Sequence, residues 1–222
     1  MFEKYLVIFD MDGVLADTGQ IHFESWVKMA NEMGVKLTRK FFEGTFGQQS
    51  VPITRKLFGD KVDQAEIVKR ANLKELYYRE MVRDKLEPLP GVIELIRTLR
   101  ENNFKLAVGS SGPPENVELL LTSLKIKEFF DIIITAADVK IGKPAPDVFL
   151  IVAKRLNLNP ECCIVIEDAP VGIKAAKRAG MVTIALTTTH IKDELSDADL
   201  ILKDLSYIEL NDIIKLLKLK MD

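Results

Sequence analysis

Near its N-terminus the chain reads Tyr5-Leu6-Val7-Ile8-Phe9-Asp10-Met11-Asp12-Gly13, an apolar run that ends on two aspartates. A run this short and this rich in β-branched residues is typical of a strand buried on both faces of a parallel sheet. Residues i and i+2 of an extended chain point to the same side, so the carboxylates of Asp10 and Asp12 are expected to face one pocket. These residues therefore predict a buried first strand with a reactive carboxyl end.

Later apolar runs repeat this strand pattern, and helical patterns separate them from Pro90 onward. The runs are Lys105–Val108, Ile132–Thr135, Cys163–Ile166, Thr183–Leu186 and Leu200–Leu202. The helical patterns cover Val92–Arg100, Glu115–Leu124, Asp147–Leu156, Gly172–Ala179 and Ile208–Leu219. Strands that alternate with helices form βαβ units, so the sequence predicts an α/β fold with a doubly wound, Rossmann-like parallel sheet.

The long segment between the first and second runs breaks this alternation. It shows helical periodicity without a convincing strand, most clearly over Gln64–Val82. About 70 residues are too many for a single connection between two strands. We therefore expect residues 1–15 and 87–222 to form the α/β core domain, and residues 16–86 to form an inserted all-helical cap domain.

Composition and charge exclude several classes of protein. The 222 residues are 47% hydrophobic, and 31 basic against 33 acidic residues give a net charge of −2, which argues against a broad basic surface for nucleic acid or anionic lipid. No apolar run approaches the roughly 18 residues of a membrane helix, and the N-terminus lacks a signal-peptide pattern. The adjacent Cys162 and Cys163 cannot form a disulfide framework. We expect a monomeric protein of the reducing cytoplasm, with neither nucleic acid nor a membrane as its partner.

Polar and charged residues also follow the other expected strands. Ser110 and Ser111 come after the second run, Lys143 after the third, and Glu167 and Asp168 after the fourth. In an open parallel sheet the reactive groups gather beyond the carboxyl ends of the strands, so these side chains are expected to meet the two N-terminal aspartates.

This set of groups points to a particular chemistry. Taken singly, Ser110 is typical of a turn, Lys143 of a solvated surface and each acid of a turn or helix cap. Together, Asp10, Asp12, Glu167 and Asp168 would crowd negative charge at one edge, which favours a hard cation such as Mg²⁺. Pro144 restricts the backbone of Lys143, so its ammonium would sit at a defined place among them. Cation, lysine, hydroxyl and carboxylate are the groups that phosphoryl transfer uses.

The order of these groups resembles the haloacid dehalogenase superfamily. The resemblance covers essentially the whole chain, helical insertion included, and is closest to the β-phosphoglucomutase-like group of mutases and small-molecule phosphatases. It rests on Asp10-Met11-Asp12-Gly13-Val14-Leu15-x-Asp17-Thr18, then Ser110, then Lys143-Pro144-x-Pro146, then Glu167-Asp168.

The resemblance implies a role for each site residue. Asp10 would be the nucleophile that forms an aspartyl phosphate, and Asp12 the general acid and base. Mg²⁺ would lie between the Asp10 carboxylate, the Asp12 backbone carbonyl and Asp168, with Glu167 supporting it. The phosphoryl group would be held by Ser110 and Lys143.

The cap residues separate a mutase from a phosphatase. The resembling mutases grip a second phosphate with a Ser-Lys pair after the strand-two serine and with an arginine in the first cap loop. Here the aligned positions read Gly112-Pro113, and the cap loop reads Gly47-Gln48-Gln49-Ser50, without a positive charge. Arg55, one or two helical turns further along, is a candidate to replace the missing cation, but a solvated helix face explains it better. We therefore expect hydrolysis of a small phosphate monoester with a neutral, hydroxyl-rich organic part, such as a sugar or polyol phosphate.

The residues expected to bind this substrate are the loop residues Gly47, Gln48, Gln49 and Ser50, together with Ser111 and His22. His22 matches a histidine position of the β-phosphoglucomutases, although a core histidine explains it equally well. Two alternatives stay open. One is a mutase of the β-phosphoglucomutase type. The other is a phospho-receiver-like signalling module, in which the accepting aspartate usually follows a later strand and no long helical cap is inserted.

Overall fold

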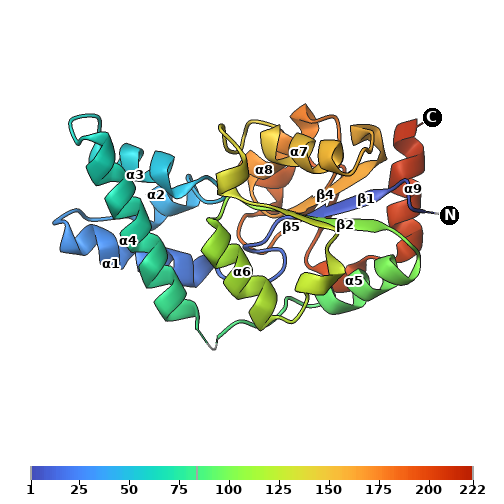
Figure 1. The fold of residues 1–222 in the computed structure, drawn as a ribbon, viewed down its shortest axis with the longest axis horizontal. Helices are drawn as coiled ribbons and strands as arrows, with labels where there is room; N and C mark the ends of the chain where they lie inside the picture. The colour runs from blue at the N-terminus through green and yellow to red at the C-terminus, as the bar shows by residue number, and fades with distance from the viewer. Residues whose placement is uncertain (1, 84, 222) are drawn as a thin grey trace.

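Six parallel strands form one sheet in the larger part of the molecule (Figure 1). The structure is a computed structural model that describes residues 2–83 and 85–221. The strands are β1 (Leu6–Phe9), β2 (Lys105–Gly109), β3 (Ile132–Ile134), β4 (Cys163–Glu167), β5 (Val182–Leu186) and β6 (Leu200–Leu202). Their order is β3-β2-β1-β4-β5-β6, so the winding reverses beside β1, which confirms the predicted doubly wound sheet.

Helices cover both faces of this sheet. They are α5 (Val92–Glu101), α6 (Pro114–Ser123), α7 (Asp147–Arg155), α8 (Pro170–Arg178) and α9 (Leu210–Met221). Val7 and Phe9 of β1 pack in the core beneath α5, α6 and α9, whereas Leu6 and Ile8 pack beneath α7 and α8. This two-sided burial explains why the first strand reads as a continuous apolar run. Short 3₁₀ turns complete the core, namely η1 (Lys127–Phe129), η2 (Ala136–Asp138), η3 (Pro160–Cys162), η4 (Lys192–Leu195) and η5 (Leu205–Tyr207).

A helical cap lies beyond the carboxyl ends of the strands (Figure 1). It contains α1 (Gly19–Glu32), α2 (Arg39–Glu43), α3 (Ser50–Phe58) and α4 (Gln64–Val82). The cap has its own apolar cluster, in which Trp26, Met29 and Phe42 are buried. The predicted all-helical insertion after the first strand is therefore confirmed, whereas the division at residues 15/16 and 86/87 stays a prediction.

Local chemistry sets the helix ends. The Asp63 carboxylate accepts a hydrogen bond of 2.9 Å from the backbone N–H of Glu66 and so begins α4, where the sequence predicts it. Helix α8 begins at Pro170, two residues earlier than predicted, because proline fits the first helical turn. Among the described residues, no helix combines the length and the apolar character needed to span a bilayer.

Candidate active site

Asp10 and Asp12 lie at the carboxyl end of β1, at the junction of the core and the cap. The Asp10 backbone N–H donates to the Ile166 carbonyl at 2.9 Å, so this residue is anchored to β4. Gly13 follows with φ of 78°, and a Cβ there would lie 2.0 Å from Asp168 Oδ2. Only glycine fits that turn without displacing the carboxylate.

Lys143 is buried between two of the acids. Its Nζ donates to Asp10 Oδ1 at 2.5 Å, to Glu167 Oε1 at 2.6 Å and to the Gly109 carbonyl at 3.1 Å. Only 4% of the Lys143 surface is exposed, so the solvated alternative for this residue is wrong. The ammonium instead holds together three strand ends that are far apart in the sequence.

Burial shifts the proton affinities of this cluster. Burial raises the pKa of Asp10 to about 7, while the charge of Lys143 opposes the rise and that of Glu167 adds to it. Burial, followed by the charges of Glu167 and Asp10, raises the pKa of Asp168 well above its usual value. Burial alone would lower the pKa of Lys143, but the charges of Asp10 and Glu167 raise it above that of a free lysine.

The same acids have the donor set of a divalent cation site. Carboxylate oxygens of Asp10, Glu167 and Asp168 lie within 4.8 Å of one another. The ammonium of Lys143 contacts only Asp10 and Glu167 of these three acids, and carboxylate oxygens of this kind suit Mg²⁺. The residues present therefore fit the cation that the sequence predicts.

Gly172 makes room for one of these carboxylates. A Cβ at Gly172 would lie 1.8 Å from Glu167 Oε1, although glycine is otherwise a poor residue inside α8. Glu167 cannot move freely, because its Oε2 accepts from the N–H groups of Asp168 and Ala169 at 2.9 and 3.0 Å.

We therefore expect Gly172→Ala to lower the free energy of unfolding by about 1–3 kcal/mol, as overpacking does, although alanine favours helices. Chemical denaturation measures this change. Gly19→Ala is the matched control, since a Cβ there meets only Thr189 Cγ2 at 3.5 Å. Equal stability of the two variants would contradict the steric explanation.

Asp12 is held by the cap rather than by the acid cluster. Its Oδ1 accepts from Thr18 Oγ1 at 2.5 Å and lies 3.0 Å from His22 Nε2. Burial alone would raise the pKa of Asp12, but His22 and then Thr18 lower it below its usual value. The carboxylate of Asp12 is not part of the cluster formed by Asp10, Glu167 and Asp168, and the role of its backbone carbonyl that the family resemblance implies stays a prediction.

Lys74 continues this chain of contacts into the cap. Its Nζ lies 2.7 Å from His22 Nδ1, and the Tyr78 ring stacks on the imidazole at 3.9 Å between centroids. An ammonium can only donate, so Nδ1 of His22 accepts, and its Nε2–H is left to donate to Asp12. His22 therefore orients the Asp12 carboxylate as well as lining the pocket.

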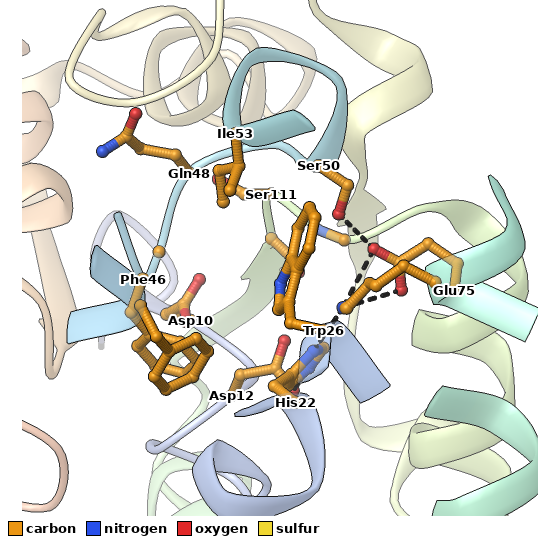
Figure 2. Close-up of a pocket in the computed structure, with 15 residues that line it drawn as sticks. Asp10, Asp12, His22, Trp26, Phe46, Gln48, Ser50, Ile53, Glu75 and Ser111 are labelled. Carbon is orange, nitrogen blue, oxygen red and sulfur yellow. Dashed lines mark hydrogen bonds and ion pairs between the residues drawn. The ribbon is translucent and has the colours of Figure 1, made fainter. Parts of the chain in front are cut away.

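The pocket between the core and the cap unites most of the predicted residues (Figure 2). From the predicted set, it is lined by Asp10, Asp12, Ser110 and Ser111 of the core and by His22, Gly47, Gln48 and Ser50 of the cap. Lys143, Glu167 and Asp168 are buried near Asp10 and are not among the residues that line the pocket.

One predicted residue, Gln49, lies elsewhere, and Arg55 does not reach the pocket either. The side chain of Gln49 donates to the Ala136 carbonyl at 3.3 Å and lines a neighbouring depression instead of the pocket. Arg55 binds the carbonyls of Gly59 and Val62 and the Gln64 side chain, which ties the end of α3 to the start of α4. It does not supply a cation to the pocket.

Sequence reasoning missed Lys74 and Glu75, which both line the pocket. They belong to a long helix-forming run and look like ordinary charged surface residues. A signal was present, since the buried face of α4 includes Ile67, Ala71 and Tyr78, and helical spacing places Lys74 and Glu75 on that same face.

Known proteins share this fold and sequence pattern. A family model for haloacid dehalogenase-like hydrolases matches residues 7–186. The chain is similar to the validoxylamine A 7'-phosphate phosphatase of Streptomyces hygroscopicus subsp. limoneus, with 34% identity over 91% of this chain and 95% of that protein. It is also similar to the fructose-1-phosphate phosphatase of Escherichia coli, with 33% identity over 82% of this chain and 96% of that protein. A crystal structure of β-phosphoglucomutase from Clostridium difficile matches with a TM-score of 0.90 and 30% identity over 98% of each chain.

Proposed function

The chain belongs to the haloacid dehalogenase-like hydrolase family and is a phosphatase, and from this premise we propose that it is a Mg²⁺-dependent phosphohydrolase that works through a phosphorylated Asp10. One observation supports the proposal most strongly. Asp10 faces the pocket and is also fixed by Lys143 within the acid cluster, where a cation and an ammonium can act on one phosphoryl group. Its position directly after β1, with a helical cap inserted behind it, disfavours a receiver-like module.

The proposed reaction has two displacements at phosphorus. A carboxylate oxygen of Asp10 attacks the phosphorus, and the bond from phosphorus to the substrate oxygen breaks as Asp12 gives that oxygen a proton. Water then attacks the aspartyl phosphate, Asp12 takes the proton back, and inorganic phosphate leaves as the Asp10 carboxylate is restored. The negative charge of a bound phosphate raises the proton affinity of Asp12, which supplies the acid form for the first step.

Other residues would position and neutralise the phosphoryl group. The Lys143 ammonium contacts Asp10, the Ser110 hydroxyl follows β2 and lines the same pocket as Asp10, and both residues are buried. Mg²⁺ would be held by Asp10, Asp168 and the Asp12 carbonyl with Glu167 in support, and it would offset the negative charge of the nucleophile and the phosphate. The cap excludes bulk water from this site.

We further propose a sugar or polyol monophosphate as the substrate. Phosphatases of sugar-like phosphates stand among the relatives, and the cap loop from Gly47 to Ser50 offers polar groups without a positive charge. The cytoplasmic location, the monomeric state and the lack of nucleic-acid and membrane partners stay predictions.

A panel of phosphorylated metabolites separates hydrolysis from mutase activity. We expect phosphate release from hexose monophosphates without efficient isomerisation, because the described pocket lining has no free cation to hold the second phosphate of a bisphosphate intermediate. Coupled assays for inorganic phosphate and for glucose 6-phosphate score both outcomes. Rapid conversion of β-glucose 1-phosphate to glucose 6-phosphate would favour the mutase instead.

A further inference from the structure

Glu75 is a buried carboxylate in the cap wall of the pocket (Figure 2). Its side chain accepts from the Ser50 hydroxyl and, at 2.6 Å, from Asn116 Nδ2 of α6 in the core. Both of its oxygens lie 3.2 Å from Lys74 Nζ. These contacts hold Glu75 in one position between the cap and the core.

Glu75 cancels the charge of its neighbour. Leaving His22 aside, Lys74 is the one basic residue among the described residues that line the pocket. Its ammonium is enclosed by Glu75 and His22, and only 1% of the residue is exposed. Burial alone would raise the pKa of Glu75, but the charge of Lys74, the nearby His22 and the hydrogen bonds from Ser50 and Asn116 lower it, which favours the ionised carboxylate. The described cap residues that line the pocket therefore present no positive charge that is free to bind a phosphate.

Glu75 also lies between the pocket and a second depression at the junction of the cap and the core. Glu75, Ser50 and Ser111 line both spaces. Apart from Glu75, the described residues around this depression are uncharged, and they include Asn72, Pro113 and Ala137. This uncharged depression therefore adjoins the pocket at Ser50, Glu75 and Ser111.

We propose that Glu75 determines specificity by charge, so that the pocket and the adjoining depression accept an uncharged, hydroxyl-bearing organic group and reject one that carries a second phosphate. This inference rests on the proposed function. A carboxylate facing a second phosphate repels it, and the repulsion is strong because the site is shielded from water. The hydroxyls of Ser50 and Ser111 remain as neutral partners for substrate hydroxyls.

Glu75→Gln tests the proposal directly, since it keeps the shape of the side chain and removes the negative charge that would repel a second phosphate. The measurement is kcat/KM for fructose 1-phosphate and for fructose 1,6-bisphosphate at constant ionic strength. We expect the ratio of bisphosphate to monophosphate activity to rise at least about tenfold, mainly through a lower KM for the bisphosphate. Glu80→Gln, the same change at an exposed position of α4, is the control and leaves the ratio unchanged.

A second variant keeps the test decisive if Glu75→Gln fails to fold. Asn72→Lys adds a cation at an exposed position of α4 that lines the depression, and the same ratio is expected to rise. An unchanged ratio in the folded variants would overturn the role of Glu75. Hydrolysis of p-nitrophenyl phosphate by the wild type reports on the proposed function separately, because that substrate has no second phosphate.

Discussion

Asp10→Asn is expected to reduce hydrolysis of p-nitrophenyl phosphate by about four orders of magnitude or more, because the amide cannot form the phosphoenzyme. The substitution keeps the size of the side chain, and it removes one of the two carboxylates that contact Lys143. The variant should therefore still fold, so that its loss of activity reflects the loss of the nucleophile. Steady-state phosphate release measures the effect.

The control for this variant is Asp60→Asn, the same substitution at an exposed position between α3 and α4. It should retain wild-type turnover. Circular dichroism and thermal unfolding of Asp10→Asn establish that the protein is folded. Turnover within tenfold of the wild type in folded Asp10→Asn would show that another group accepts the phosphoryl group.

Removal of divalent cations is expected to have the second-largest effect on the rate of hydrolysis. Asp10, Glu167 and Asp168 carry more negative charge than Lys143 balances, and burial raises the pKa of Asp10 and of Asp168. Without a cation, these two carboxyls tend to hold protons, and a protonated Asp10 is a poor nucleophile. EDTA should abolish hydrolysis, and Mg²⁺ in excess should restore it.

Binding can be measured apart from activity. At a Mg²⁺ concentration about a hundred times its dissociation constant, the folded protein should gain about 2.7 kcal/mol of stability, seen as a rise in Tm. Asp168→Asn should lose most of this gain, whereas Asp197→Asn, at an exposed position, should keep it. Full activity in metal-free buffer, or an equal Mg²⁺ effect on Tm in Asp168→Asn, would contradict the cation site.

Much of the fold follows from local sequence. The central strands of the sheet read as apolar runs because they are buried on both faces, as Leu6 and Val7 illustrate on opposite sides of β1. The helical insertion is visible because no strand pattern interrupts it. The expectation that reactive groups gather beyond the carboxyl ends of parallel strands also predicts that Asp10, Lys143 and Glu167 meet, although more than a hundred residues separate the first two.

The cap wall of the pocket was harder to predict. Lys74 and Glu75 are unremarkable on a helix read alone, and they become buried only when α4 packs against His22 of α1 and Asn116 of α6. The orientation of Gln49 toward Ala136 likewise depends on how the cap meets the core. Helical spacing places Lys74 and Glu75 on the buried face of α4, but their partners in the core and in α1 are set by tertiary packing, which periodicity and motif spacing do not encode.

The central claim is that the phosphoryl group passes through Asp10, and trapping that intermediate tests it most directly. Borohydride added during turnover of a phosphate monoester reduces an aspartyl phosphate to homoserine, and peptide mass spectrometry locates the modified residue. We predict homoserine at position 10, only when substrate is present, and none in Asp10→Asn. Homoserine at another position, or an unmodified residue 10 in enzyme quenched during a burst of product release, would contradict the claim.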